Sequence, residues 1–176
     1  RKWKDLKVIG GLIILSAANI WFHLSVLGNL DVDAAARLAI GAYTMLIMIV
    51  GGRIVPSFTR NWLNKVGRTD FPVPYNRFDT AAILIGVAAL AAWTFAPVHI
   101  VTAAIALLAS AFHTVRFLRW HGSPTWPEKL LFVLHVAYAF VPLGFLAISA
   151  GAVELLGDYP VMHVLSSEER RVGKEG

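Results

Sequence analysis

Residues 98–120 form an apolar segment that contains two histidines and is long enough to cross a lipid bilayer. The fourteen positions from His99 to His113 correspond to four helical turns less about 40°, so both side chains are predicted on nearly the same helix face. At about 1.5 Å per residue they lie roughly 21 Å apart, one near each end of the span. Imidazole in hydrocarbon is costly without a partner, which makes both histidines candidate functional residues. We expect this helix to ligate a metal or haem together with histidines on neighbouring helices.

The composition is that of a polytopic membrane protein. Of the 176 residues, 57% are hydrophobic and 15% are charged, whereas soluble domains have about 25% charged residues. The mean hydropathy is +0.62. Because the chain has no cysteine, disulfides and thiolate-ligated clusters are excluded, and histidines are the main candidate ligands for a transition metal.

Apolar segments recur along the chain and predict an all-α bundle of five complete transmembrane spans. These segments cover residues 7–28, 34–56, 79–95, 98–120 and 128–150. Pro56 is expected to end the second helix, because proline lacks the N–H that would continue it. Residues 57–78 then form the one long polar segment of the chain.

The C-terminal residues depart from this pattern. A short loop is predicted over residues 151–159, and residues 160–165 are predicted to begin a sixth helix that is truncated. The charged run 166–176 is interpreted as a non-native or disordered tail. Residues 1–165 then form a single transmembrane domain.

The positions of lysine and arginine predict the orientation of the protein in the membrane. Basic residues cluster before the first span and in the second-to-third and fourth-to-fifth connections, whereas acidic residues predominate in the others. Cytoplasmic loops carry the excess of positive charge, so we expect a multi-pass protein with a cytoplasmic N-terminus. Its expected partner is the lipid bilayer and not nucleic acid.

The histidines fall into two groups by their expected depth. His113 and His135 each lie about seven residues from the cytoplasmic end of adjacent antiparallel helices, where two imidazoles can reach one metal or one haem iron. His23, His99 and His163 form a second group near the outer face. For these three, the alternative is an interfacial histidine that bonds to a nearby carbonyl group or to water.

A second candidate site lies in the segment GGRIVPSFTRN at the end of the second span. Its two glycines allow close helix packing, and Arg53 lies inside the span, where a charge needs a partner or water. Arg60 and Asn61 follow. This cluster has the chemistry to hold a haem propionate, an anion or a lipid headgroup. The alternative is an arginine that extends to the interface, together with ordinary positive-inside charges.

The segment GGRIVPSFTRNWL resembles the Gly-Arg-x-x-Pro-x-Phe-Thr-Arg-Asn motif of the NnrS family. RFLRWHGSPTWPEKL, LLFVLHVAYAFVPLGFL and PVMHVL are similar to later parts of that family, so the resemblance covers most of residues 1–165. It implies a larger bacterial inner-membrane protein that contains haem and copper and is linked to nitric oxide tolerance. The chain would then be a truncated fragment whose missing part is a partner. The positions that match the family are Arg53, Pro56, Thr59, Arg60, Asn61, His135 and His163.

These observations favour a membrane protein that binds haem, copper or both and acts in the nitric oxide response. The predicted metal ligands are His113 and His135. The predicted cofactor-binding residues are His113, His135, His99, His163, His23, Arg53, Arg60 and Asn61. One alternative is a transporter or channel for a small anion, with Arg53 and Arg60 at its entrance. Another is a structural half that packs against the missing part.

Overall fold

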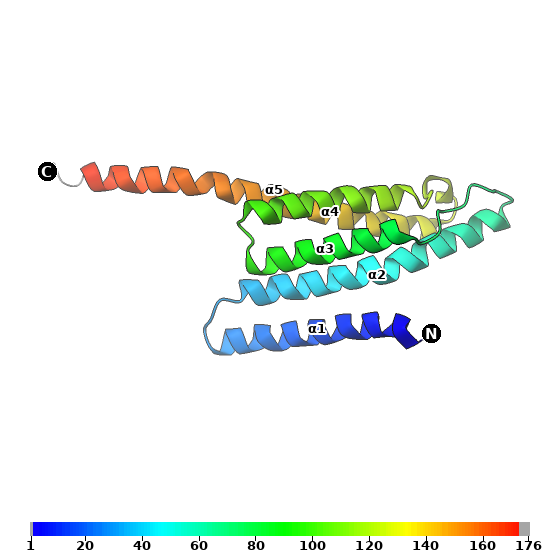
Figure 1. Ribbon diagram of the computed structural model, residues 1–176, viewed down its shortest axis with the longest axis horizontal. Helices are drawn as coiled ribbons and strands as arrows, with labels where there is room; N and C mark the ends of the chain where they lie inside the picture. The colour runs from blue at the N-terminus through cyan, green and yellow to red at the C-terminus, as the bar shows by residue number, and fades with distance from the viewer. Residues whose placement is uncertain (1, 173–176) are drawn as a thin grey trace.

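A computed structural model of the protein describes the backbone of residues 2–172 and the side chains of residues 8–153 (Figure 1). The described residues contain helices and no strands, which confirms the all-α prediction. In chain order the elements are α1 (Lys2–Leu27), α2 (Asp33–Lys65), α3 (Arg77–Phe95), α4 (Ile100–Leu118), the short 3-10 helix η1 (Ser123–Thr125) and α5 (Lys129–Val172).

Within the described residues, five helices are long and apolar enough to cross a membrane, as predicted. The candidate spans are Val8–Leu27, Asp33–Lys65, Arg77–Phe95, Ile100–Leu118 and Lys129–Val153. Large apolar side chains such as Leu84 and Phe95 lie on the outer surface of the bundle, where a bilayer would solvate them. The protein is therefore a multi-pass membrane protein.

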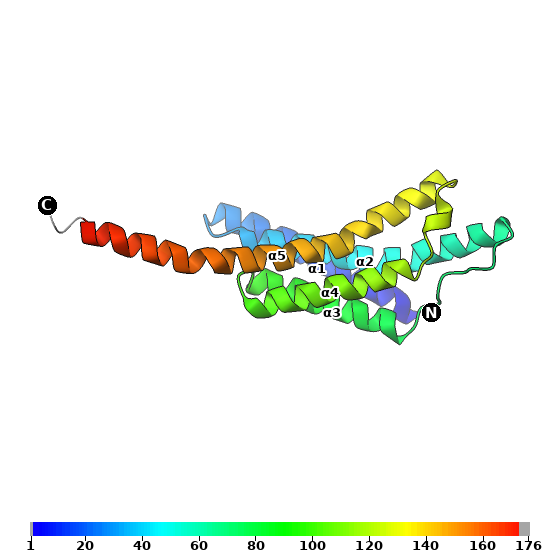
Figure 2. The ribbon, with the colours of Figure 1, turned by 90° about the horizontal axis from the view of Figure 1, so that it is seen from above.

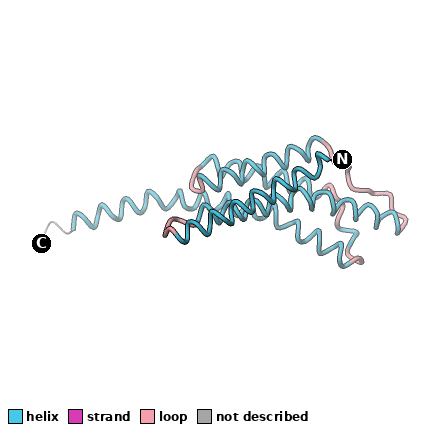
Figure 3. Tube along the Cα trace, turned by 90° about the horizontal axis from the view of Figure 1, so that it is seen from below, coloured by secondary structure: helices cyan, strands magenta, loops and turns pink. Residues whose placement is uncertain are grey.

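Helices α2 to α5 pack together, whereas α1 lies at the edge of the bundle and, among the described residues, contacts only α2 (Figures 1 and 2). Loops join the helices at both ends of the bundle (Figure 3), and the C-terminal part of α5 extends beyond the other helices. Fully buried alanines, including Ala82 and Ala89 on α3 and Ala106 and Ala109 on α4, lie in the core. Such small residues let helix backbones approach closely.

Helix α2 does not end at Pro56 but continues to Lys65, so that part of the prediction was wrong. Beyond the proline, Thr59 and Leu63 are both fully buried, one turn apart. Packing of this face offsets the hydrogen bond that proline removes, and neighbouring helices commonly make such prolines tolerable in transmembrane helices. The polar connection between α2 and α3 is correspondingly shorter than predicted and covers residues 66–76.

The backbone of α5 is one continuous helix to Val172, so the structure contains neither the predicted loop over residues 151–159 nor a separate sixth helix. Two glycines in that segment favoured a loop, but its alanine, leucine and glutamate residues have high helix propensity. Side chains from residue 154 onward, including His163, lie outside the described residues. The interpretation of residues 166–176 as a non-native tail stays a prediction.

Candidate functional site

Four buried polar side chains from three helices form a connected cluster inside the bundle. They are Asp79 on α3, His113 and Arg116 on α4, and Tyr138 on α5. Arg116 and His113 have no exposed surface, Tyr138 is 2% exposed and Asp79 is 4% exposed. Charged groups are rare inside a membrane bundle, and those that occur there are paired and mark functional sites.

Arg116 is the centre of this cluster. Its Nε donates to Asp79 Oδ1 over 3.0 Å, while Nη1 donates to the Met48 carbonyl oxygen at 3.1 Å and to Tyr138 Oη at 2.8 Å. The guanidinium also lies close to Gly52, because a Cβ added at that glycine would contact Nη2 and lie 2.7 Å from Cζ. The second glycine of the GGR segment thus leaves the space that the arginine occupies.

Asp79 has two further polar contacts. Its Oδ2 accepts a hydrogen bond of 3.0 Å from the backbone N–H of Asn76 and so completes a capping box at the start of α3. Arg119 Nη1 lies 3.7 Å from the same oxygen. The N-terminus of a helix also favours negative charge. Asp79 is therefore held between two arginines and the end of a helix.

His113 has one bonded ring nitrogen and one without a partner. Nδ1 lies 3.1 Å from Tyr138 Oη, and the ring stacks on Phe145 with 5.5 Å between centroids. Nε2 is buried and has no hydrogen-bond partner among the side chains and backbone groups that the structure describes. A Cβ added at Gly86 would lie 3.0 Å from Nε2 and 2.8 Å from Met48 Sδ. His113 Nε2 and Met48 Sδ therefore both lie next to Gly86.

His135 is buried as well, but both of its ring nitrogens have protein partners. Nδ1 lies 3.0 Å from the Leu131 carbonyl oxygen, and Nε2 lies 3.2 Å from Thr59 Oγ1. The ring packs against Phe117 and fills the space beside Gly122. The structure thus buries both predicted metal ligands and gives each ring its own set of partners. Their ligation of a shared metal stays a prediction.

The structure does not bring the described outer histidines together. The His99 side chain caps α4, where Nδ1 accepts a 3.1 Å hydrogen bond from the backbone N–H of Val101. This is the local backbone bond of the alternative interpretation. His23 is exposed on α1, next to Phe22. The third member, His163, lies outside the described side chains.

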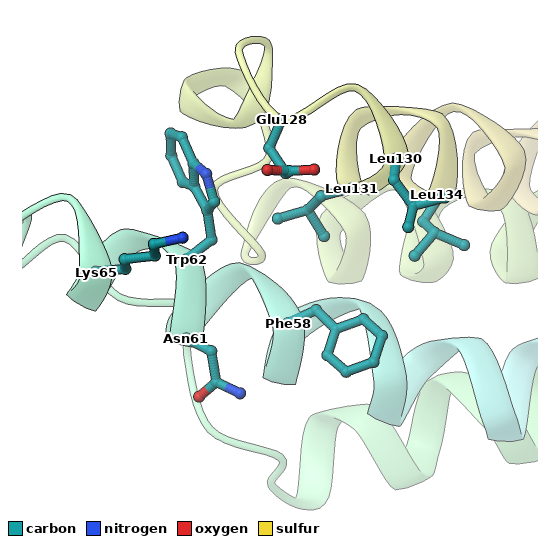
Figure 4. Close-up of a pocket in the computed structure, with 8 residues that line it drawn as sticks. All are labelled: Phe58, Asn61, Trp62, Lys65, Glu128, Leu130, Leu131 and Leu134. Atoms are coloured by element: carbon teal, nitrogen blue, oxygen red, sulfur yellow. The ribbon is translucent and has the colours of Figure 1, made fainter.

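Arg53 and Arg60 line one cavity of about 700 Å³, which lies between α2, the start of α3 and the connection between them. Asn61 lines a different groove of about 290 Å³ between the end of α2 and the start of α5 (Figure 4). In Figure 4, Trp62 lies toward Glu128 across this groove. The predicted arginine pair therefore shares a site that Asn61 does not line.

Arg116, Asp79, Tyr138 and Met48 were not predicted as site residues. A usable signal existed for Arg116, which lies three residues after His113 in an apolar span and therefore on nearly the same helix face. The positive-inside bias by itself also accounts for a basic residue at this end of the span. For Met48, Asp79 and Tyr138 the chain offers no local signal, since each joins the cluster only through helix packing. Among the described residues, no three histidine or acidic side chains gather in a metal-binding group.

Comparison with known proteins gives one family match. The family described as "NnrS protein" matches residues 1–168. No curated protein and no solved structure gives a significant match.

Proposed function

The chain belongs to the NnrS family, and on that premise we propose that it binds copper through His113 and acts in the response to nitric oxide. The observation that carries this proposal is the buried Nε2 atom of His113, which has no hydrogen-bond partner within the described part of the chain. Leaving a buried polar atom unpaired costs about 1–3 kcal/mol. A metal ion would give this nitrogen a partner.

Met48 supports copper(I) as the metal at this place. Its sulfur and His113 Nε2 both lie within about 3 Å of the position of a Cβ on Gly86. Thioether and imidazole are ligands of copper(I), which is a soft ion, whereas hard cations prefer oxygen. The Ala82 carbonyl group also faces the imidazole, but no well-directed hydrogen bond joins it to Nε2. When bound, copper(I) supplies a reduced metal centre able to bind nitric oxide.

Tyr138 and Arg116 support this role by controlling the other ring nitrogen. Arginine can only donate, so Tyr138 Oη accepts from Arg116 Nη1. When His113 carries its proton on Nδ1, this N–H donates to the phenol oxygen, and the Nε2 lone pair is then free for a metal. Partners of this kind orient metal-binding histidines and fix their tautomer.

Haem fits the surroundings of His113 less well than copper. Met48, Gly86 and Phe145 occupy the space around the imidazole, and a porphyrin ring needs that space to be open. The cavity of about 700 Å³ has more room, but none of its described lining residues is a histidine. The described side chains therefore favour copper at His113.

The proposed location is the bacterial inner membrane with a cytoplasmic N-terminus. Support comes from basic residues at one end of the bundle: the exposed Lys65, Arg68 and Arg77 at and between the ends of α2 and α3, and the partly buried Arg119 at the end of α4. Such an excess of basic residues is typical of the cytoplasmic side.

Metal content and the visible spectrum of the purified, reduced protein test this proposal. We expect copper to co-purify with the wild type and to be lost in His113→Ala and in Met48→Leu, which keeps an apolar side chain of similar volume. His23→Ala is the matched control, since this histidine is exposed. Thermal unfolding in detergent shows whether each variant remains folded. Copper retained by a folded His113→Ala protein would overturn the proposal, and so would a Soret band that depends on His113.

A further inference from the structure

We propose that the cavity of about 700 Å³ binds the phosphate group of an anionic membrane phospholipid, with Arg53 and Arg60 as its ligands. This inference is independent of the copper site. The cavity lies between α2, the α2–α3 connection, the start of α3 and Trp120, at the basic end of the bundle. Its volume is within the usual range of about 300–1,000 Å³ for sites that bind small molecules.

Arg53 and Arg60 give the cavity a net positive charge. Seven positions apart on one helix, they lie on nearly the same face and roughly 10 Å apart along the axis. Among the described side chains, neither forms an ion pair with an acidic residue. Asp79 also lines the cavity, but its charge is already compensated by Arg116 and Arg119.

The side chain of Arg60 is partly held in position before any ligand binds. Its guanidinium carbon lies 5.2 Å from the centre of the Phe71 ring, in a cation–π contact. Such a contact leaves the N–H groups at the edge of the guanidinium free to bind phosphate oxygens. Ser57, Tyr75 and Thr80 add hydroxyl groups to the same cavity.

The apolar part of the lining favours a lipid over a free anion. Ile49, Ile83 and Leu84 line the cavity together with the arginines. The Leu84 side chain is 64% exposed on the outer surface of the bundle, which in a membrane faces acyl chains. The cavity therefore joins a basic region to the lipid-facing surface. A phospholipid matches this arrangement, because its charged phosphate group is joined to apolar acyl chains. Basic pockets between transmembrane helices are known sites for anionic headgroups.

The connection that covers the cavity is held in place by two contacts with the end of α4. The backbone N–H of Val73 donates to the Arg119 carbonyl oxygen at 3.1 Å. His121 Nδ1 lies 3.2 Å from the Asp70 carbonyl oxygen. Pro72 and Pro74, on either side of Val73, line the cavity and restrict the backbone further. A site formed in advance loses less conformational entropy when a ligand binds.

Native mass spectrometry of the full-length protein from nanodiscs, with phosphatidylglycerol or phosphatidylcholine as lipid, tests the proposal. We expect the wild type to retain phosphatidylglycerol in preference to phosphatidylcholine. The double variant Arg53→Gln/Arg60→Gln should bind phosphatidylglycerol roughly 30-fold more weakly, given the usual contribution of each arginine near a membrane surface. Arg77→Gln is the matched control, because this exposed arginine lies at the same end but does not line the cavity.

Two results would overturn the proposal. One is equal retention of phosphatidylglycerol by the wild type and the double variant. The other comes from titration with inorganic phosphate: arginine-dependent phosphate binding without any lipid preference would assign the cavity to a free anion. Copper content, measured on the same samples, should not change in the double variant, so the two proposals can fail separately.

Discussion

Arg116 Nε lies 3.0 Å from Asp79 Oδ1, and this ion pair joins α4 to α3 in the interior of the bundle. The arginine has no exposed surface and the aspartate is 4% exposed. The arginine cannot be hydrated where it lies and the aspartate has little exposed surface, so each charge depends mainly on the other. The same arginine reaches Tyr138 and, through it, His113. The pair therefore connects the proposed phospholipid cavity, which Asp79 lines, with the proposed copper ligand.

Breaking this pair should destabilise the protein strongly. Asp79→Asn leaves the Arg116 charge buried without its carboxylate, and such changes typically cost about 3–5 kcal/mol. We expect a lower unfolding temperature in detergent, while Asp70→Asn, which removes the carboxylate of the exposed Arg68–Asp70 pair, should change it little. Equal effects of the two variants would show that the buried pair has no special role. In a double-mutant cycle, Asp79→Asn and Arg116→Gln should be less than additive.

Gly52 and Gly144 should respond in opposite ways to alanine. A Cβ at Gly52 would meet the Arg116 guanidinium, whereas nothing lies within 4 Å of a Cβ at Gly144. Gly52→Ala should therefore cost about 1–3 kcal/mol through overpacking. Gly144→Ala should be neutral or stabilise the helix by up to about 1 kcal/mol. Thermal unfolding of the two variants measures the difference, and a harmless Gly52→Ala would contradict the close approach of Arg116.

Tyr138→Phe should weaken copper binding, if the proposed function is right, without removing either ligand. The variant deletes the oxygen that holds His113 Nδ1, and loss of such a supporting partner typically lowers metal affinity about 10–100-fold. Competition with a copper chelator gives the affinity. Tyr43→Phe is the matched control, because Tyr43 is 61% exposed. An unchanged affinity in a folded Tyr138→Phe protein would show that the phenol does not orient the imidazole.

The Arg68–Asp70 pair predicts a local pH dependence in the connection that covers the cavity. The hydrogen bond from Arg68 lowers the pKa of Asp70 below its ordinary value. The stability that this pair contributes is therefore present above the ordinary pKa of aspartate and is lost as the pH falls through the lowered pKa. Arg68→Gln should raise the pKa of Asp70, as measured by NMR of labelled aspartate. Arg77→Gln should leave it unchanged, and a shift of equal size there would argue for a general charge effect.

The absence of cysteine allows a direct test of the proposed orientation. Leu30→Cys, in the α1–α2 connection, should react with a membrane-impermeant maleimide on spheroplasts. Thr69→Cys, in the α2–α3 connection, should react only after the membrane is opened. Both native residues are exposed, so access by the reagent depends on the side of the membrane. The reverse pattern would place the N-terminus outside.

The number of spans and the basic end of the bundle were predictable because they depend on properties that add up along the chain. A run of apolar residues of sufficient length predicts a span whatever it packs against. The end of α2 was not predictable in this way. Pro56 indicated a stop, but the burial of Thr59 and Leu63 beyond it favours a longer helix. The boundary therefore depends on packing as well as on the proline.

By itself, the sequence determined an all-α membrane bundle, the approximate limits of its spans and the position of His113 and His135 inside two of them. Only the tertiary structure decided which imidazole nitrogen has no partner and which residues surround it. His113 and Tyr138 are 25 positions apart, and Arg116 and Asp79 are 37 apart. Their meeting depends on how each helix is rotated and tilted against its neighbours. Hydropathy along a helix restricts that rotation only loosely, because apolar side chains in a membrane protein face both the lipid and the core.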